Sequence, residues 1–170
     1  MLFMPYQERD EALVISWLES EKQFYQWSSG VLGPYPLRAG RLNDFYREWK
    51  QNHKYMVFCG CDDEMNPVGQ MILRYPDEDR RHIRFGFILI DPARRGRGLG
   101  RRMLELAIGY ARDYLKAEDI CLGVYTNNPG AVALYEKLGF RATGEIEESE
   151  YMGETWHCQE MMLSLQHKLY

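Results

Sequence analysis

The sequence predicts an α/β fold (α+β) with a mixed sheet. Six short segments show the alternating or continuous apolar pattern of strands, and four longer ones place their apolar residues at helical spacing. In the second half of the chain these strands and helices follow one another in turn, which favours helices packed onto one sheet.

Two helices and a hairpin are expected in the first half of the chain. Helical spacing covers residues 8–21 and again about 39–51. Residues 28–36 between them are rich in Gly and Pro and are expected to be irregular, because proline has no amide donor. Two strand-like runs, at 55–61 and 67–75, are separated by an acidic turn and predict a hairpin.

The second half is expected to alternate strands and helices before it ends in two strands. The run HIRFGFILI becomes apolar throughout its second half, which suggests a strand buried there on both faces. Pro129 suits the first turn of the last helix, and Gly139 suits its end. The expected elements are a strand at 82–90, a helix at 98–116, a strand at 120–126, a helix at 129–139, and strands at about 140–149 and 155–165.

Composition indicates one soluble domain spanning residues 1–170. The chain is 45% hydrophobic with a formal net charge of −4, which argues against general nucleic-acid binding. No apolar run is long enough to cross a membrane, and the N-terminus does not resemble a secretory signal, so we expect a cytoplasmic protein. Its four cysteines lack the paired spacing of a zinc site, so we expect reduced thiols and no metal.

The stretch DPARRGRGLGRRML, residues 91–104, leads from a predicted strand into a predicted helix. A helix start presents free N–H groups and the positive end of its dipole, and nearby glycines let phosphate oxygens approach the backbone. The glycines are Gly96, Gly98 and Gly100, and the arginines beside them are Arg95, Arg97 and Arg101. A bound phosphate would explain this positive charge, which otherwise opposes the dipole; a solvated basic helix start is the alternative.

Two common phosphate-binding patterns do not fit. The dinucleotide pattern G-x-G-x-x-G would need a glycine where this chain has Arg101. The nucleotide-triphosphate loop needs a lysine followed by Ser or Thr, and no such pair follows these glycines.

The pattern Arg95-x-x-Gly98-x-Gly100 resembles the acetyl-CoA pyrophosphate loop of the GNAT N-acetyltransferase superfamily, [Q/R]-x-x-G-x-[G/A]. A second stretch, NNPGAVALYEKLGF, resembles the superfamily's N-x-x-A-x-x-L-Y-x-K-x-G-F signature. Its matching residues are Asn128, Ala131, Leu134, Tyr135, Lys137, Gly139 and Phe140. Two motifs in the right order, each after a strand, imply the GNAT acyl-CoA N-acyltransferase fold, with a central mixed, mostly antiparallel sheet flanked by helices. Residues 1–54 match this fold only in outline.

The resemblance implies acetyl-CoA as co-substrate, with its pantetheine arm between two splayed strands. The first strand would line the arm, the glycine turn would hold the pyrophosphate, and Asn128 would contact the arm from the far side. Sheet core and a helix N-cap are the alternative roles of these residues. The expected cofactor-binding residues are Ile88, Leu89, Ile90, Arg95, Gly96, Arg97, Gly98, Leu99, Gly100, Arg101 and Asn128.

The implied reaction is direct attack of a neutral amine on the thioester. Tyr135 occupies the family's position for the acid that protonates the leaving thiolate, although a buried structural tyrosine would give the same pattern. Many relatives carry a glutamate on the strand before the loop, but HIRFGFILI has no acid. The proton of the amine is therefore left to a water chain or to one of four candidates, Glu145, Glu147, Glu160 and His157.

The acceptor is expected to be an amine of a small molecule or peptide, and a homodimer is possible. Trp27 and Tyr35 beside the Gly/Pro-rich loop are the preferred pocket candidates, whereas aromatic residues at helical spacing are expected in the core. Acidic runs at 62–64, 77–79 and 145–150 suit a polyamine or simply form solvated surface. A non-catalytic acyl-CoA sensor and a transferase of longer acyl chains are the alternatives.

Overall fold

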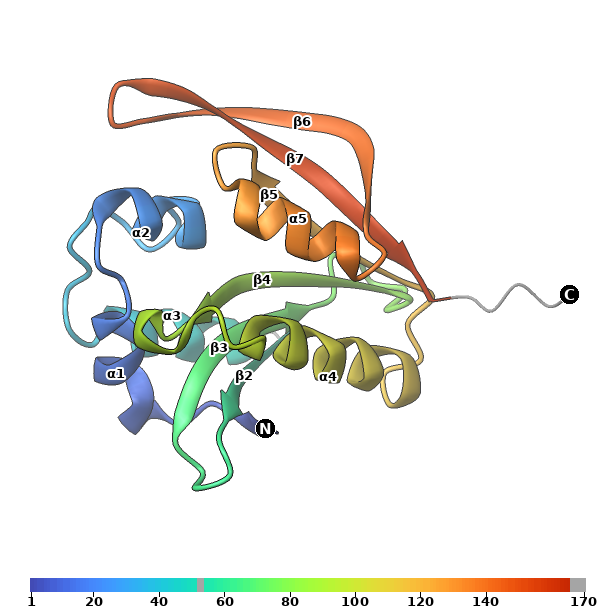
Figure 1. Cartoon of the computed structure of the whole chain (residues 1–170), viewed down its shortest axis with the longest axis horizontal. Coiled ribbons are helices and arrows are strands. Elements are labelled where there is room, and N and C mark those ends of the chain that lie inside the picture. Colours follow the sequence, from blue (N-terminus) through green and yellow to red (C-terminus); the bar gives the residue numbers. More distant parts are fainter. Residues whose placement is uncertain (52–53, 166–170) are drawn as a thin grey trace, which may run out of the picture.

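A computed structural model describes residues 1–51 and 54–165; residues 52–53 and 166–170 of the expected domain lie outside the described part. A seven-stranded mixed sheet forms its centre, in the order β1-β2-β3-β4-β5-β7-β6 (Figure 1). The strands are β1 (Leu2–Pro5), β2 (Tyr55–Cys61), β3 (Pro67–Arg74), β4 (His82–Ile90), β5 (Asp119–Tyr125), β6 (Arg141–Tyr151) and β7 (Glu154–Ser164). The predicted fold class and six predicted strands are thus confirmed, and the short edge strand β1 was missed.

The helices are η1 (Glu8–Asp10), α1 (Glu11–Ser16), α2 (Glu21–Ser28), α3 (Arg41–Lys50), η2 (Pro92–Arg94), α4 (Leu99–Asp113) and α5 (Pro129–Lys137). The prediction of one helix over 8–21 was wrong, because helix α1 ends at Ser16 and a new helix, α2, begins at Glu21. Ser20 caps that new helix by accepting a hydrogen bond from the Gln23 amide at 3.2 Å. Within the described residues no helix is long and apolar enough to cross a membrane.

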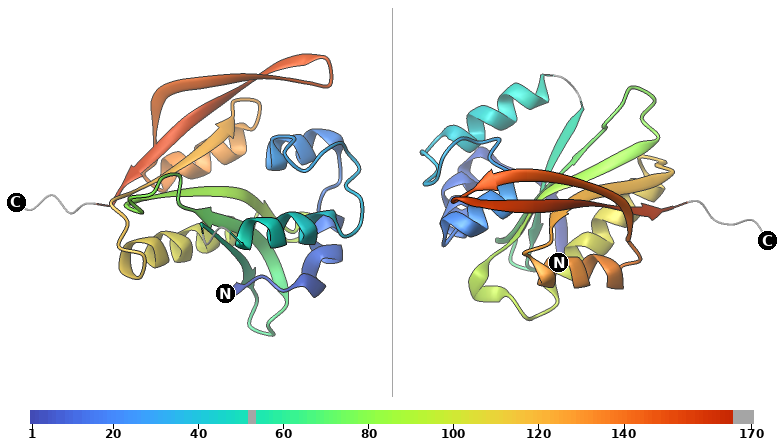
Figure 2. Two further views of the ribbon diagram at one scale, coloured as in Figure 1. Left: turned by 180° about the vertical axis from the view of Figure 1, so that it is seen from behind. Right: turned by 90° about the horizontal axis from the view of Figure 1, so that it is seen from above.

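Helices cover both faces of the sheet with separate cores. In Figure 1 α4 lies on the near face, and the view from behind in Figure 2 shows α3 on the opposite face. Helices α1, α2 and α3 pack against β2 and the end of β4, whereas α4 and α5 share their core with β3, β5 and the start of β4. The apolar stripe of α4 is fully buried at Met103, Leu104, Ala107 and Ala111.

A β-bulge in β4 changes the face of the sheet that its fully buried residues fill. Gln70 pairs with Leu89 and Ile72 with Gly86, so the single residue Met71 stands opposite two residues of β4. Phe87, inside the bulge, has a φ of +50°. Ile83 and Phe85 consequently point into the α4 core, whereas Phe87 and Leu89 point into the α1–α3 core.

Strands β4 and β5 form the only parallel pair among the described strands, and their pairing is short. It joins residues 82–84 to residues 119–121 and ends there, while both strands continue. Beyond Arg84 the edge of β4 that faces β5 has no strand partner, so the sheet opens between them. The sequence-based expectation of two strands that splay apart is therefore met by the fold.

Candidate functional site

A cavity of about 1070 Å³ lies at this opening and extends from the glycine turn before α4 toward α2. We call its two ends the α4 half and the α2 half. The α4 half is lined by Ile88, Leu89, Ile90, Arg95, Gly96, Gly98, Leu99, Gly100, Arg101, Asn128, Leu134 and Tyr135. The α2 half is lined by Gln23, Gln26, Trp27, Trp49, Tyr55, Arg74, Arg84, Glu147, Ser149, Tyr151 and Cys158.

The glycine turn forms the outer wall of the α4 half. Gly96 and Gly98 both have a φ of +75°, which L-residues with a side chain rarely adopt, and open space surrounds the positions that a Cβ would take. Gly98 is the N-cap of α4, and the first intrahelical bond runs from the Arg102 amide to the Gly98 carbonyl at 3.0 Å. The three preceding helical amides are therefore free to donate to an anion.

Four of the five arginines of this stretch differ in their surroundings. Arg94 binds the carboxylate of Asp62 at 2.7 Å and so has a structural partner. Arg101 lines the cavity and pairs with Glu105 at 2.8 Å, whereas Arg95 lines the cavity with no ion pair among the described residues. Arg97 lies outside the cavity lining, on the exposed surface of the turn. The structure thus brings every expected cofactor-binding residue except Arg97 to the cavity.

Helix α5 places Asn128 and Tyr135 on the opposite wall of the α4 half. The Asn128 side chain accepts a hydrogen bond from the Ala131 amide at 3.3 Å, so it caps α5 and lines the cavity at once. The Tyr135 ring is buried and packs edge-on against Phe140, and its hydroxyl has no hydrogen-bond partner among residues 1–51 and 54–165. Burial raises the pKa of the Tyr135 phenol, which keeps it protonated at neutral pH.

Aromatic and polar side chains line the α2 half. Trp27 packs against Phe87 with their ring centroids 4.8 Å apart, and its indole N–H is buried without a partner among the described residues. Tyr35, the other predicted pocket residue, packs on Phe24 and does not line the cavity. Tyr25 of α2 stacks on Tyr151 of the β6–β7 hairpin at 4.9 Å, which closes this half where the hairpin reaches over α2 in Figure 1.

Of the four candidate bases, Glu147 alone lines the cavity. Glu160 is bound to Arg84, with its Oε1 2.5 Å from Nη1. His157 points to the other side of the hairpin, where its Nε2 lies 3.2 Å from Glu148. Glu145 is exposed outside the cavity. The absence of an acid on β4 leaves Glu147 as the carboxylate placed to act on a group in the α2 half.

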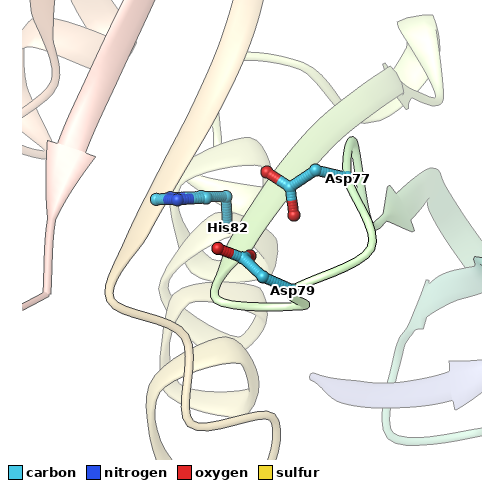
Figure 3. Close-up of side chains that lie close together, drawn as sticks. All are labelled: Asp77, Asp79 and His82. Carbon is cyan, nitrogen blue, oxygen red and sulfur yellow. The ribbon is translucent and has the colours of Figure 1, made fainter.

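A second polar cluster lies in the β3–β4 loop, far along β4 from the glycine turn. Asp77, Asp79 and His82 lie close together (Figure 3), and their possible ligand atoms are all within 4.8 Å of one another. Two of them already have partners: Asp79 binds Arg81 at 2.9 Å and His82 Nδ1 lies 2.8 Å from Asp119. His82 therefore takes part in a contact that joins β4 to β5, and Asp79 in an ion pair within the loop.

Comparison with known protein families identifies the family of this chain. The model of the acetyltransferase (GNAT) family matches residues 14–140, which include the glycine turn and helix α5. The chain belongs to the GNAT acetyltransferase family. Its fold class, its two motifs and its expected enzyme class are thereby confirmed.

The individual proteins that this chain resembles have low sequence identity to it. A spermine/spermidine N(1)-acetyltransferase of Bacillus subtilis is 34% identical over 73 residues, which cover 42% of this chain and 48% of that protein. A spermidine N(1)-acetyltransferase of Vibrio cholerae is 28% identical over 127 residues, covering 75% and 73% of the two chains. The crystal structure of a spermidine N-acetyltransferase from Vibrio cholerae, solved with CoA and spermine, superposes with a TM-score of 0.81 at 22% identity, over 96% of this chain and 94% of that one.

Proposed function

We propose that this GNAT acetyltransferase moves the acetyl group of acetyl-CoA to a primary amine of a small molecule or peptide. The observation that carries the proposal is the single cavity that extends from the glycine turn, past the opening between β4 and β5, to the α2 half. A pyrophosphate at the turn and an amine in the α2 half would then share one cavity. Acetyl-CoA supplies an activated thioester when it is bound.

The α4 half suits the phosphate and pantetheine parts of CoA. Gly96 and Gly98 leave open space over the free amides of α4, and Arg95 adds a charge that no described residue neutralises. The unpaired edge of β4 at Ile88–Ile90 offers backbone groups to an extended amide chain, as a neighbouring strand would. Asn128 faces that chain from α5. Arg97 is placed to contact a phosphate only from outside the turn.

We propose Tyr135 as the acid that protonates the leaving thiolate. Three features support this role: the residue lines the cavity, its hydroxyl is not engaged by a described residue, and burial keeps it protonated. Glu147 is proposed to accept the proton of the incoming ammonium, directly or through water. The ammonium loses two protons in all: the first goes to Glu147 before attack, and the second passes to water as the nitrogen–carbon bond forms and the carbon–sulfur bond breaks. Tyr135 donates a proton to the sulfur and regains one from water.

Polyamines are a second candidate class of acceptor. The named relatives act on spermine or spermidine, and the β6–β7 hairpin carries five glutamates between Glu145 and Glu154. An acidic surface of this kind attracts cations to the cavity entrance. Of these five, however, Glu147 alone lines the cavity.

Two measurements test the proposal. CoA is expected to raise the melting temperature by mass action, and no shift at millimolar CoA would contradict the assigned cavity. Thiol release from acetyl-CoA is then followed with monoamines, polyamines, amino acids and short peptides, and a productive amine is expected. Binding of CoA without thiol release across that panel would instead indicate an acyl-CoA sensor. Competition among acyl-CoA lengths decides whether acetyl is the preferred group.

A further inference from the structure

Two arginines face each other in the α2 half, and one of them has no carboxylate partner among the described residues. Arg74 of β3 and Arg84 of β4 stand directly opposite each other, half-buried, and both line the cavity. Arg84 is bound to Glu160 at 2.5 Å. Arg74 makes no ion pair or side-chain hydrogen bond within residues 1–51 and 54–165. Of these two facing guanidinium groups, Arg84 therefore has a carboxylate partner and Arg74 has none in the described part of the chain.

This pair of arginines lies far from the phosphate-binding turn. Arg84 is the third residue of β4, and the turn follows the last, so about 20 Å separates them at roughly 3.3 Å per residue. Arg74 also pairs in register with Tyr55, whose ring stacks on Trp49 at 4.0 Å. All four residues line the same end of the cavity. A ligand group bound there would belong to the acceptor and not to the nucleotide of CoA.

The arrangement is unfavourable unless an anion completes it. Like charges directly opposite each other on neighbouring strands repel, and partial burial removes some of the water that would screen them. A carboxylate would supply the partner that Arg74 lacks, and its two oxygens match the planar fork of a guanidinium. An ammonium group at the same place would add a third positive charge.

We propose that the acceptor carries a carboxylate besides its amine, and that Arg74 binds this carboxylate. The inference rests on the proposed transfer to an amine and specifies its substrate class. Glu147 on β6 provides the opposite charge in the same half of the cavity, so the site is complementary to an amino carboxylate. A polyamine, by contrast, would bring ammonium groups toward Arg74.

A series of amines matched in length tests the charge preference. Each length from three to six carbons is represented by an ω-amino carboxylate, an alkylamine and a diamine; with four carbons these are 4-aminobutyrate, butylamine and putrescine. Thiol release from acetyl-CoA gives kcat/KM for each. The carboxylate member is expected to exceed the other two at least tenfold at the best length.

Variants of Arg74 connect the preference to this residue. Arg74→Gln should abolish the preference for the carboxylate, mainly through KM, and Arg74→Lys should retain part of it. Arg9→Gln is the matched control, because Arg9 is exposed on η1 outside the cavity, and it should change nothing.

The outcomes separate this inference from the proposed function. Diamines or alkylamines that react as well as the carboxylates, or a preference that survives Arg74→Gln, would overturn the inference and leave amine transfer intact. If none of the amines causes release of thiol, the proposed function is contradicted. The inference would then be decided by binding: a melting-temperature shift by 4-aminobutyrate in the CoA complex that Arg74→Gln removes supports it, and no such shift overturns it.

Discussion

Arg84 of β4 reaches across β5 to Glu160 of β7, and it passes over Gly123 on the way. The Arg84 Nη1 lies 2.5 Å from Glu160 Oε1, and a Cβ on Gly123 would lie 3.0 Å from Arg84 Nη2 and 2.9 Å from the Cys158 sulfur. The ion pair joins the two strands next to the opening of the sheet, and the missing side chain at Gly123 gives it room.

Gly123→Ala is expected to destabilise the fold. The added methyl group must displace the Arg84 guanidinium or Cys158, at a cost of about 1–3 kcal/mol in the free energy of unfolding. Urea unfolding measures this change. Gly109→Ala in α4 is the matched control, since nothing lies within 4 Å of its Cβ position. It should stabilise by up to about 1 kcal/mol through helix propensity, so equal effects of the two variants would disprove the crowding at Gly123.

Gly98→Ala is expected to weaken CoA binding at least tenfold. The variant places a methyl group in the open space over the α4 amides and strains a backbone with a φ of +75°. Gly40→Ala provides the control, because Gly40 is the N-cap of α3 with a φ of +82° and also has open space around it. Both variants carry a similar strain of about 1–2 kcal/mol. Calorimetric titration with CoA should show the loss in Gly98→Ala alone.

Tyr135→Phe is expected to lower kcat by about 100-fold or more, in line with the loss of a general acid. CoA affinity should change little, because the ring and its packing against Phe140 remain. Since burial raises the pKa of Tyr135, the wild-type rate should not fall through ionisation of this phenol between pH 6 and 9. Tyr110→Phe, outside the cavity, is the control. An unchanged kcat in Tyr135→Phe would exclude the acid role.

The stability of the fold should fall as pH rises through the titration of His82. The hydrogen bond to Asp119 raises the pKa of His82, so the folded chain binds this proton more tightly than the unfolded chain does. The stabilisation is complete below the unfolded pKa of about 6.5 and is lost as pH rises through the folded pKa. Chemical denaturation between pH 5.5 and 8.5 measures it. His82→Gln should flatten this dependence, and an unaltered slope in that variant would refute the assignment.

Much of the fold could be predicted because local signals and packing agree. Strand β4 was predicted with its observed ends, since His82–Ile90 is bounded by a polar loop and by Asp91-Pro92. The start of α2 was missed although Ser20 and Gln23 have the S-x-x-Q spacing of a capping box, a signal that could have revealed it. Strand β1 has only four residues and ends in Pro5, which leaves almost no periodicity to detect.

The α4 half of the site could be predicted, whereas the α2 half could not. Residues of the glycine turn and α5 follow one another in short motifs, so their spacing alone places them together. Arg74, Tyr55 and Glu147 come from three strands and meet only through the register of the sheet. The bulge at Phe87 could not be predicted from the sequence either. Apolar residues continue at every second position along β4, but before the bulge they face the α4 core and from Phe87 on they face the α1–α3 core.

The short pairing of β4 with β5 has a mechanical consequence. Within the described residues, only three residues of each strand pair these neighbours in the sheet. The α4 core and the contact between His82 and Asp119 also connect β4 with β5, and the Arg84–Glu160 pair connects β4 with β7 beyond it. A ligand seated along the open edge would occupy the place of the missing hydrogen-bond ladder. Binding of the ligand would then also hold β4 and β5 together. Hydrogen exchange of the amides along Ile88–Ile90 would be slowed by the bound ligand and would measure both effects.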